Sequence, residues 1–416
     1  MIENSSIALV SLGCAKNAVD LQVMAGNLLK KGCTLSPDPD NADVVIVNTC
    51  SFISDAREES ENEILRALRL KEKGCFKKVI VTGCYPERYP ERIRDFPGVD
   101  EWVGVPKEWV EPKIPALRFT GKAFAYLKIA EGCAHRCAYC AIPKIRGKYR
   151  SRPQCSILKE ARALIDSGCK ELNIVAQDPM LYGVDIADKT GKKRSVKLVS
   201  LLKEIDKIPG EFWVRVLYSY PSEITEDFVV WLMTSPHACR YVDVPLQHTV
   251  PEVLANMNRK GAIAASRSAA EVLRACVEGI SLRTTIMTGF PGETEKRFNQ
   301  LLSDIKRMQF DHLGAFAYSP EKGTKGAAMK ARVSRKVALD RKDQVMKLQS
   351  AIWKYKAKRM IGNTYLALIV APGVARMESQ APEVDGVVYV DSDSVGEFVS
   401  VKLKRVKGYD FVGEIV

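Results

Sequence analysis

Three short apolar runs rich in β-branched residues mark the first hundred residues, and each run ends in a cysteine. They are IALVSLGC, DVVIVNTC and KKVIVTGC, which end at Cys14, Cys50 and Cys84. Between them, residues 18–32 and 59–74 repeat apolar side chains at helical spacing, and both stretches close on a glycine. Strands that alternate with helices predict a parallel sheet. The three cysteines are therefore expected at its carboxyl edge, where open α/β sheets bind ligands.

A second alternating series begins near residue 115, after a proline-bearing segment. Six apolar runs in this series predict strands, and they read AFAYLKIAEG, ELNIVAQD, FWVRVLYSYP, YVDVPLQH, LRTTIMTGF and HLGAFAYS. Amphipathic helical stretches separate them, such as residues 156–168. Six βα units are fewer than the eight that close a barrel. The pattern therefore predicts a partial, open (βα)6 barrel of the TIM-like kind.

The end of the chain changes character to short β runs separated by glycine turns. This pattern predicts a small antiparallel β-barrel, similar to a TRAM domain. The predicted fold class is therefore α/β with three domains. They are an N-terminal parallel α/β domain over residues 1–114, the central partial barrel over 115–356, and the C-terminal barrel over 357–416.

Charge and composition restrict the surroundings of the protein. The chain has 63 Lys and Arg against 50 Asp and Glu, a net charge of +13 that suits nucleic acid or ribosomal neighbours. Residues 330–360 alone hold 11 basic and 2 acidic side chains, which predicts a basic helix or pair of helices connecting two domains. A solvated helix face is the plain alternative interpretation of these charges.

No apolar run approaches the roughly 18 residues of a membrane span, and the N-terminus lacks the basic start of a signal peptide. We therefore expect a cytoplasmic protein without a membrane partner. In that compartment the 12 cysteines are expected to include metal or redox ligands rather than structural disulfides.

The strongest local motif is EGCAHRCAYCAIP, which spaces Cys133, Cys137 and Cys140 as C-x3-C-x2-C directly after the first strand of the second series. Three thiolates in one loop suit three irons of a cubane iron–sulfur cluster, and the fourth iron then stays open. An open coordination position distinguishes a catalytic metal site from a structural one. Two alternatives stand beside this interpretation: a zinc site that uses His135 as fourth ligand, and a redox cysteine pair.

This spacing, with Tyr139 before the last cysteine, resembles the radical S-adenosylmethionine superfamily. The resemblance implies that the three cysteines bind a [4Fe-4S] cluster and that S-adenosyl-L-methionine chelates the open iron. An electron from the cluster then cleaves the cofactor to a 5′-deoxyadenosyl radical. Tyr139 is a candidate cofactor contact, together with three polar residues at strand ends that face the expected cavity, namely Gln177, Arg215 and Gln247.

The whole chain has a second, narrower resemblance. The N-terminal cysteine triad, the radical domain and the C-terminal barrel occur in the domain order of the methylthiotransferases. The stretches SLGCAKNAVD, NTCSFISDAREES, GCYPERYPE and IRGKYRSRP resemble the RimO-type branch. The resemblance implies that Cys14, Cys50 and Cys84 bind a second [4Fe-4S] cluster that carries the inserted sulfur. All six cysteines are then catalytic, and a second S-adenosylmethionine supplies the methyl group.

The RimO-type branch also implies the substrate, which is the β-carbon of an aspartate in small-subunit ribosomal protein S twelve. It implies an electron donor such as flavodoxin or ferredoxin. The C-terminal segment 361–416 holds 5 basic and 8 acidic residues, and this mild negative charge suits a basic protein better than tRNA. Two alternative functions stay open: methylthiolation of a tRNA adenosine, and a non-catalytic iron–sulfur module that binds the ribosome.

Overall fold

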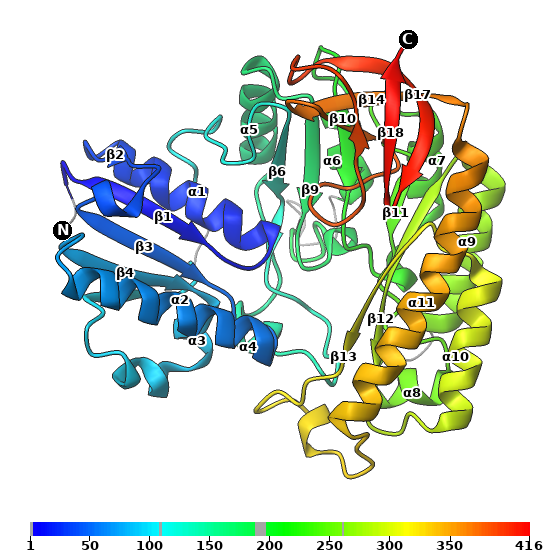
Figure 1. The fold of residues 1–416 in the computed structure, drawn as a ribbon, viewed down its shortest axis with the longest axis horizontal. Helices are drawn as coiled ribbons and strands as arrows, with labels where there is room; N and C mark the ends of the chain where they lie inside the picture. The colour runs from blue at the N-terminus through cyan, green and yellow to red at the C-terminus, as the bar shows by residue number, and fades with distance from the viewer. Residues whose placement is uncertain (1–2, 108–109, 188–196, 260–261) are drawn as a thin grey trace.

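The computed structural model describes residues 3–107, 110–187, 197–259 and 262–416, and over 262–268 it describes the backbone alone. The chain forms three units in sequence order (Figure 1). An N-terminal sheet with helices comes first, a central arc of parallel strands follows, and a small closed barrel packs against that arc. This order of units confirms the α/β fold class predicted from the sequence.

The N-terminal sheet consists of five parallel strands in the order β2-β1-β3-β4-β5. These are β1 (Ser6–Ser11), β2 (Thr34–Leu35), β3 (Val44–Thr49), β4 (Lys78–Gly83) and β5 (Glu101–Val103). Helices α1 (Ala15–Leu29), α2 (Ser54–Glu72) and α3 (Cys84–Arg88) follow β1, β3 and β4. All six residues of β3 are buried, as a central strand covered on both faces requires.

Alternate residues of these strands pack against different helices. Val44 and Ile46 share one core with Leu21 of α1, while Val45 and Val47 share another with Ile64 of α2. The two helices therefore cover opposite faces of the sheet. The carboxyl ends of the strands point toward the central unit (Figure 1).

The central unit contains the six predicted strands. They are β6 (Phe124–Lys128), β9 (Glu171–Val175), β10 (Trp213–Val216), β11 (Tyr241–Asp243), β12 (Ser281–Thr288) and β13 (His312–Ala317). They form two parallel sheets, β10-β9-β6 and β11-β12-β13. A bridge links Val214 of β10 to Ala238, three residues before β11, and β10 lies against β11, so the strands make one arc. The short strands β7 (Ala130–Glu131) and β8 (Arg150–Ser151) pair beside its first strand. The predicted partial (βα)6 barrel is confirmed.

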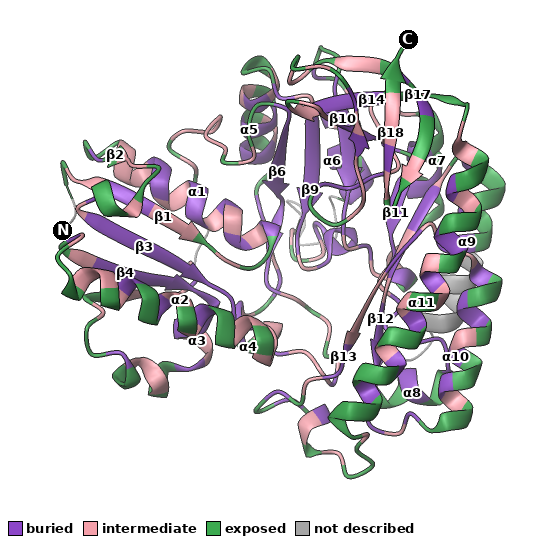
Figure 2. Cartoon of the chain, in the orientation of Figure 1, coloured by how far each residue is buried: buried purple, intermediate pink, exposed green. Residues whose placement is uncertain are grey.

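Helices cover the outside of the arc, and the strands between them are buried (Figure 2). The helices of this unit are α4 (Ile142–Ile145), α5 (Gln154–Asp166), α6 (Leu198–Ile205), α7 (Glu226–Thr234), α8 (Pro251–Asn256), α9 (Ala262–Cys276), α10 (Glu295–Met308) and α11 (Arg335–Met360). Apolar side chains of α5, α6, α7, α9 and α10 form one continuous core with the inner strands. The arc has six strands, two fewer than the eight that close such a barrel.

The predicted basic segment is the single helix α11. Ala338, Val345 and Ile352 lie on its buried face, and Trp353 lies within the core of the C-terminal barrel. Its basic side chains on the opposite face are exposed, including Lys336. The helix thus joins two units, and most of its positive charge is solvated.

The C-terminal unit is a closed barrel in the order β14-β15-β16-β18-β17. Its strands are β14 (Thr364–Ala371), β15 (Val374–Met377), β16 (Val388–Tyr389), β17 (Phe398–Lys407) and β18 (Asp410–Ile415). All pairs are antiparallel except β16 with β18, which is parallel. The antiparallel barrel expected from the sequence is therefore correct apart from that pair.

This barrel covers the amino-terminal end of the arc. Glu171, the first residue of β9, pairs with Arg376, and Tyr241, the first residue of β11, donates to Asp385 at 2.8 Å. His312, the first residue of β13, contacts the same carboxylate at 3.3 Å. The cysteine loop lies at the opposite, carboxyl end of the arc. Among the described helices, none is long and apolar enough to cross a membrane.

Candidate metal centres

The three N-terminal cysteines meet at the carboxyl edge of the first sheet. Cys14 precedes α1, Cys50 follows β3 directly, and Cys84 begins α3 directly after β4. Strands β1, β3 and β4 are hydrogen-bonded neighbours that run the same way, so their ends lie side by side. Gly13 has a φ of +92°, and a Cβ there would lie 2.8 Å from Cys50 Cβ, so glycine is required. The edge location was expected, and cluster binding by these thiols stays a prediction.

Asn17, in the first turn of α1, joins these strand ends. Its side-chain amide donates to the carbonyls of Leu12 and Thr49 at 3.2 and 2.8 Å. Its Oδ1 accepts from the Cys84 thiol at 3.5 Å. Because Asn17 is only 1% exposed, these bonds fix the relative positions of three loop starts.

The three thiols differ in their electrostatic surroundings. Burial raises the pKa of Cys84 to about 12 although Arg146 opposes the shift, and burial also raises the pKa of Cys50. Desolvation acts to raise the pKa of Cys14, but the positive charges of Lys16 and Arg146, together with the backbone N–H groups of Asn17 and Lys16, outweigh it and lower that pKa. Because a metal binds the thiolate, metal binding by the buried pair releases protons.

The second cysteine group lies on the loop after β6 and β7, at the carboxyl end of the arc. Cys133, Cys137 and Cys140 are all half-buried there. Gly132, at φ +75°, opens the loop, and a Cβ on it would lie 2.1 Å from the Lys148 carbonyl oxygen. Only glycine permits this close approach. The backbone therefore requires Gly132, just as the metal site requires the thiol of the cysteine that follows it.

Burial raises the pKa of Cys133 to about 11 and that of Cys140 to about 12, and the neighbouring Cys137 adds to both shifts. Within the described part of the chain, no three His, Cys, Asp or Glu side chains surround a position for a single metal ion. Each thiolate of a cubane binds a different iron, so cluster ligands stand farther apart than the ligands of one ion. Two sets of three soft sulfur donors fit iron–sulfur clusters.

His135 is held by two side-chain contacts. Its Nε2 lies 2.7 Å from Asp178 Oδ2, and its ring stacks on Tyr220 with centroids 3.8 Å apart. The carboxylate occupies Nε2 and orients the ring, so a metal could reach this histidine only through Nδ1. We therefore assign His135 to the support of the loop.

Three of the predicted cofactor contacts are Tyr139 of this loop and the strand-end residues Gln177 and Gln247. The Tyr139 hydroxyl accepts from Arg259 Nη1 at 3.3 Å, and its ring meets Phe290 edge to face. Gln177 donates to Glu131 Oε1 at 2.9 Å. Among the described residues, the buried Oε1 atoms of Gln177 and Gln247 have no hydrogen-bond donor. Unsatisfied buried acceptors at a strand edge fit a ligand that donates hydrogen bonds.

Arg215 takes a different place from the one its strand-end position suggested. Its Nε donates to Glu171 Oε1 at 2.8 Å and its Nη1 to the Glu378 carbonyl at 2.6 Å. The guanidinium also lies 4.7 Å from the ring centroid of Tyr241. These contacts face the C-terminal barrel, so the structure does not group Arg215 with the cysteine loop. An inward-facing side chain in a strand can point to either end of a barrel, and the strand pattern alone does not say which.

Two functional candidates escape the motif analysis. Arg259 is 4% exposed and lies 3.9 Å from Cys137 Sγ, but it is 119 or more residues along the chain from the cysteine loop and has no local signal. Glu131 immediately precedes Gly132, to whose backbone N–H its Oε1 is bonded at 3.1 Å. An acidic residue directly before the Gly-Cys of the motif was a signal available in the sequence, whereas its burial was not.

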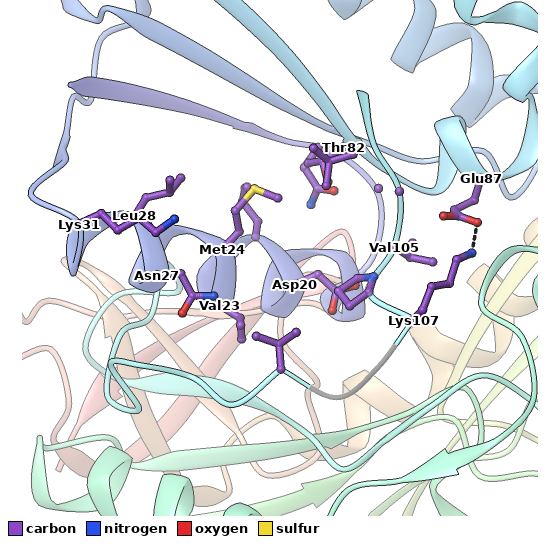
Figure 3. Close-up of a pocket in the computed structure, with 17 residues that line it drawn as sticks. Asp20, Val23, Met24, Asn27, Leu28, Lys31, Thr82, Glu87, Val105 and Lys107 are labelled. Atoms are coloured by element: carbon purple, nitrogen blue, oxygen red, sulfur yellow. Dashed lines mark hydrogen bonds and ion pairs between the residues drawn. The ribbon is translucent and has the colours of Figure 1, made fainter. Parts of the chain in front are cut away.

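A largely apolar cavity of about 500 Å³ lies beside the first cysteine group (Figure 3). Val23, Met24 and Leu28 of α1 line it from one side, and Val105 lines it from another. An ion pair between Glu87 and Lys107 stands at its edge. Among the described residues, no cysteine lines this cavity. It is therefore separate from the two candidate metal centres.

Three family models match the chain. The uncharacterized protein family UPF0004 matches residues 6–104, the radical SAM superfamily matches residues 127–305, and the TRAM domain matches residues 361–416. Together they span the three units of the fold.

The chain is similar to full-length relatives and to solved structures. It is 39% identical to the ribosomal protein uS12 methylthiotransferase RimO of Desulfitobacterium hafniense, over 99% of both chains. It is 40% identical to the protein of that name from Clostridioides difficile, over 99% of this chain and 98% of the other. The radical S-adenosylmethionine methyltransferase TsrM of Kitasatospora setae, with cobalamin and a [4Fe-4S] cluster bound, matches at a TM-score of 0.55 and 16% identity. That match covers 76% of this chain and 75% of the other, and it shows a shared fold.

Proposed function

The chain belongs to the family of ribosomal protein uS12 methylthiotransferases, and from this membership we propose that it methylthiolates the β-carbon of an aspartate in uS12. The observation that carries the proposal is the pair of cysteine groups at the carboxyl ends of two neighbouring sheets. Arg146, from the loop of one group, lies 3.6 Å from Cys84 Sγ of the other. Two such groups in contact suit a reaction that needs a substrate radical and a sulfur source together.

Each domain contributes a separate part of this activity. We assign residues 1–114 to the cluster that carries sulfur, 115–356 to the radical centre, and 357–416 to substrate binding. When bound, two [4Fe-4S] clusters and S-adenosylmethionine supply the electron, the radical, the sulfur and the methyl group. Cys133, Cys137 and Cys140 hold the radical cluster.

The side chains around the loop position the cofactor and keep its site ordered. Gln177 and Gln247 each offer a buried acceptor to the cofactor's N–H and O–H groups. Tyr139 stands between two of the cluster cysteines in sequence, and Arg259 fixes its hydroxyl. His135, clamped between Asp178 and Tyr220, stiffens the start of the loop.

Charge supports a protein substrate over tRNA. Residues 361–416 carry 5 basic and 8 acidic side chains, whereas tRNA binding needs clustered cations that displace counterions. A ribosomal protein is basic and complements this surface. Purified enzyme supplied with S-adenosylmethionine labelled in its methyl group should transfer label to uS12 or small ribosomal subunits. Label found in tRNA alone would overturn the assignment of the substrate.

An electron donor and a location follow from this chemistry. We propose flavodoxin or ferredoxin as electron donor, because cluster reduction requires single electrons at low potential. Since ribosomal proteins are made and assembled in the cytoplasm, we place the reaction there.

Iron content provides a direct measure of the two centres. We expect about eight irons per chain after anaerobic reconstitution, four for each cubane. Replacing Cys133, Cys137 and Cys140 together should leave about four, and so should replacing the N-terminal three. Iron and sulfide assays on both triple variants test this result. A content near four in the unaltered protein would contradict the second centre.

A further inference from the structure

Four charged side chains lie between the two cysteine groups, three of them buried and the fourth, Asp20, half-buried. Arg146 Nη1 is 2.9 Å from both Asp20 Oδ2 and Glu131 Oε2, and Lys128 Nζ is 2.7 Å from Glu131 Oε2. Lys128 also pairs with Asp20. Asp20 belongs to α1 of the N-terminal domain, whereas the other three belong to the central domain. The cluster of two cations and two anions is therefore electrically balanced and joins the two domains.

Arg146 extends from this balanced cluster to a sulfur of the N-terminal group. Its Nη2 donates to Cys84 Sγ at 3.6 Å and to Asn17 Oδ1. Arg146 is 3% exposed, and its carboxylate partners hold the other edge of the guanidinium. The cation therefore cannot swing into solvent, and its N–H groups remain directed at the thiol.

The position of Arg146 in the chain links this contact to the other cysteine group. Arg146 follows α4, six residues after Cys140, and its backbone N–H bonds to the Ile142 carbonyl at 2.8 Å. On the other side, Glu131 lies two residues before Cys133. The segment that follows the cysteine loop of one proposed cluster thus places the fixed positive charge of Arg146 beside Cys84, a proposed ligand of the other cluster.

We infer that Arg146 is a positioning residue that raises the reduction potential of the N-terminal cluster. A positive charge near the cluster and an N–H donor to a ligand sulfur both stabilise the more negative, reduced state. This inference rests on the proposed function in one respect, namely that Cys14, Cys50 and Cys84 bind a cluster.

The test isolates that cluster in the full-length protein. The parent variant C133A/C137A/C140A leaves the N-terminal group as the cluster site. In this background we compare Arg146→Gln, Arg146→Lys and the control Arg150→Gln. Arg150, the first residue of β8, lies four residues farther along the chain and donates to the Pro106 carbonyl at 3.4 Å, and it has no hydrogen bond to a cysteine among the described residues. Iron content and the midpoint potential from an EPR-monitored dithionite titration are measured for each.

We expect a lower midpoint potential in Arg146→Gln, a smaller decrease in Arg146→Lys, and the parent value in Arg150→Gln. Full iron content with an unchanged potential in Arg146→Gln would overturn the inference and leave the proposed function intact. If Arg146→Gln loses its iron, Arg146→Lys decides, because it keeps the charge and loses the fork of N–H donors. A parent potential in Arg146→Lys would then overturn the inference. Absence of iron from the parent variant would instead overturn the proposed second cluster.

Discussion

Replacing Cys133 by alanine is expected to abolish reductive cleavage of S-adenosylmethionine. The loop offers three thiols for three irons, so removing one leaves the cluster without a full set of protein ligands. Cys133 is held in place by the turn at Gly132. The measurement is the yield of 5′-deoxyadenosine after reduction with dithionite.

A matched control uses a cysteine of the same domain that lies away from the loop. Cys155, at the start of α5, is exposed, so Cys155→Ala should retain the yield of the unaltered protein. Cleavage by the Cys133 variant at the level of this control would contradict the assigned radical centre.

The second large effect separates the two cysteine groups. Cys50→Ala should retain cleavage of S-adenosylmethionine and lose the methylthio product, because it alters the sulfur-carrying centre and leaves the radical loop untouched. Cys50 is buried beside Gly13, and alanine removes the sulfur without adding volume. Mass spectrometry of the substrate, together with the yield of 5′-deoxyadenosine, measures both activities in one reaction.

Cys75→Ala serves as its control, since Cys75 is half-buried in the N-terminal domain and precedes the amino end of β4, whereas Cys84 follows the carboxyl end of that strand. This variant should form product normally. Methylthio product from Cys50→Ala would show that the N-terminal group has another role.

Much of this fold is predictable because its signals are local. Alternating β-branched runs and amphipathic stretches specify six strands of the arc and the cysteine-ended strands of the first sheet. Parallel pairing then brings Cys14, Cys50 and Cys84 to one edge, since all carboxyl ends of such a sheet lie together. The order of the three units follows from the same patterns.

The contacts between units could not be predicted from such local patterns. Arg215 pairs with Glu171 and with a carbonyl of the C-terminal barrel, a contact that depends on how two domains pack. Arg259 reaches Cys137 from a distant segment of the chain. Asn17 and Asp20 are intermediate cases: they lie three residues apart on α1, just after Cys14, and helical spacing places them on one face.

The most direct test of whether this chain modifies uS12 is the intact mass of uS12 from cells with and without the gene. We expect uS12 from cells that hold the gene to carry one methylthio group and uS12 from deletion cells to lack it. Restoring the gene should restore the mass, and the Cys133→Ala form should not. An identical mass of uS12 in both strains would contradict the claim.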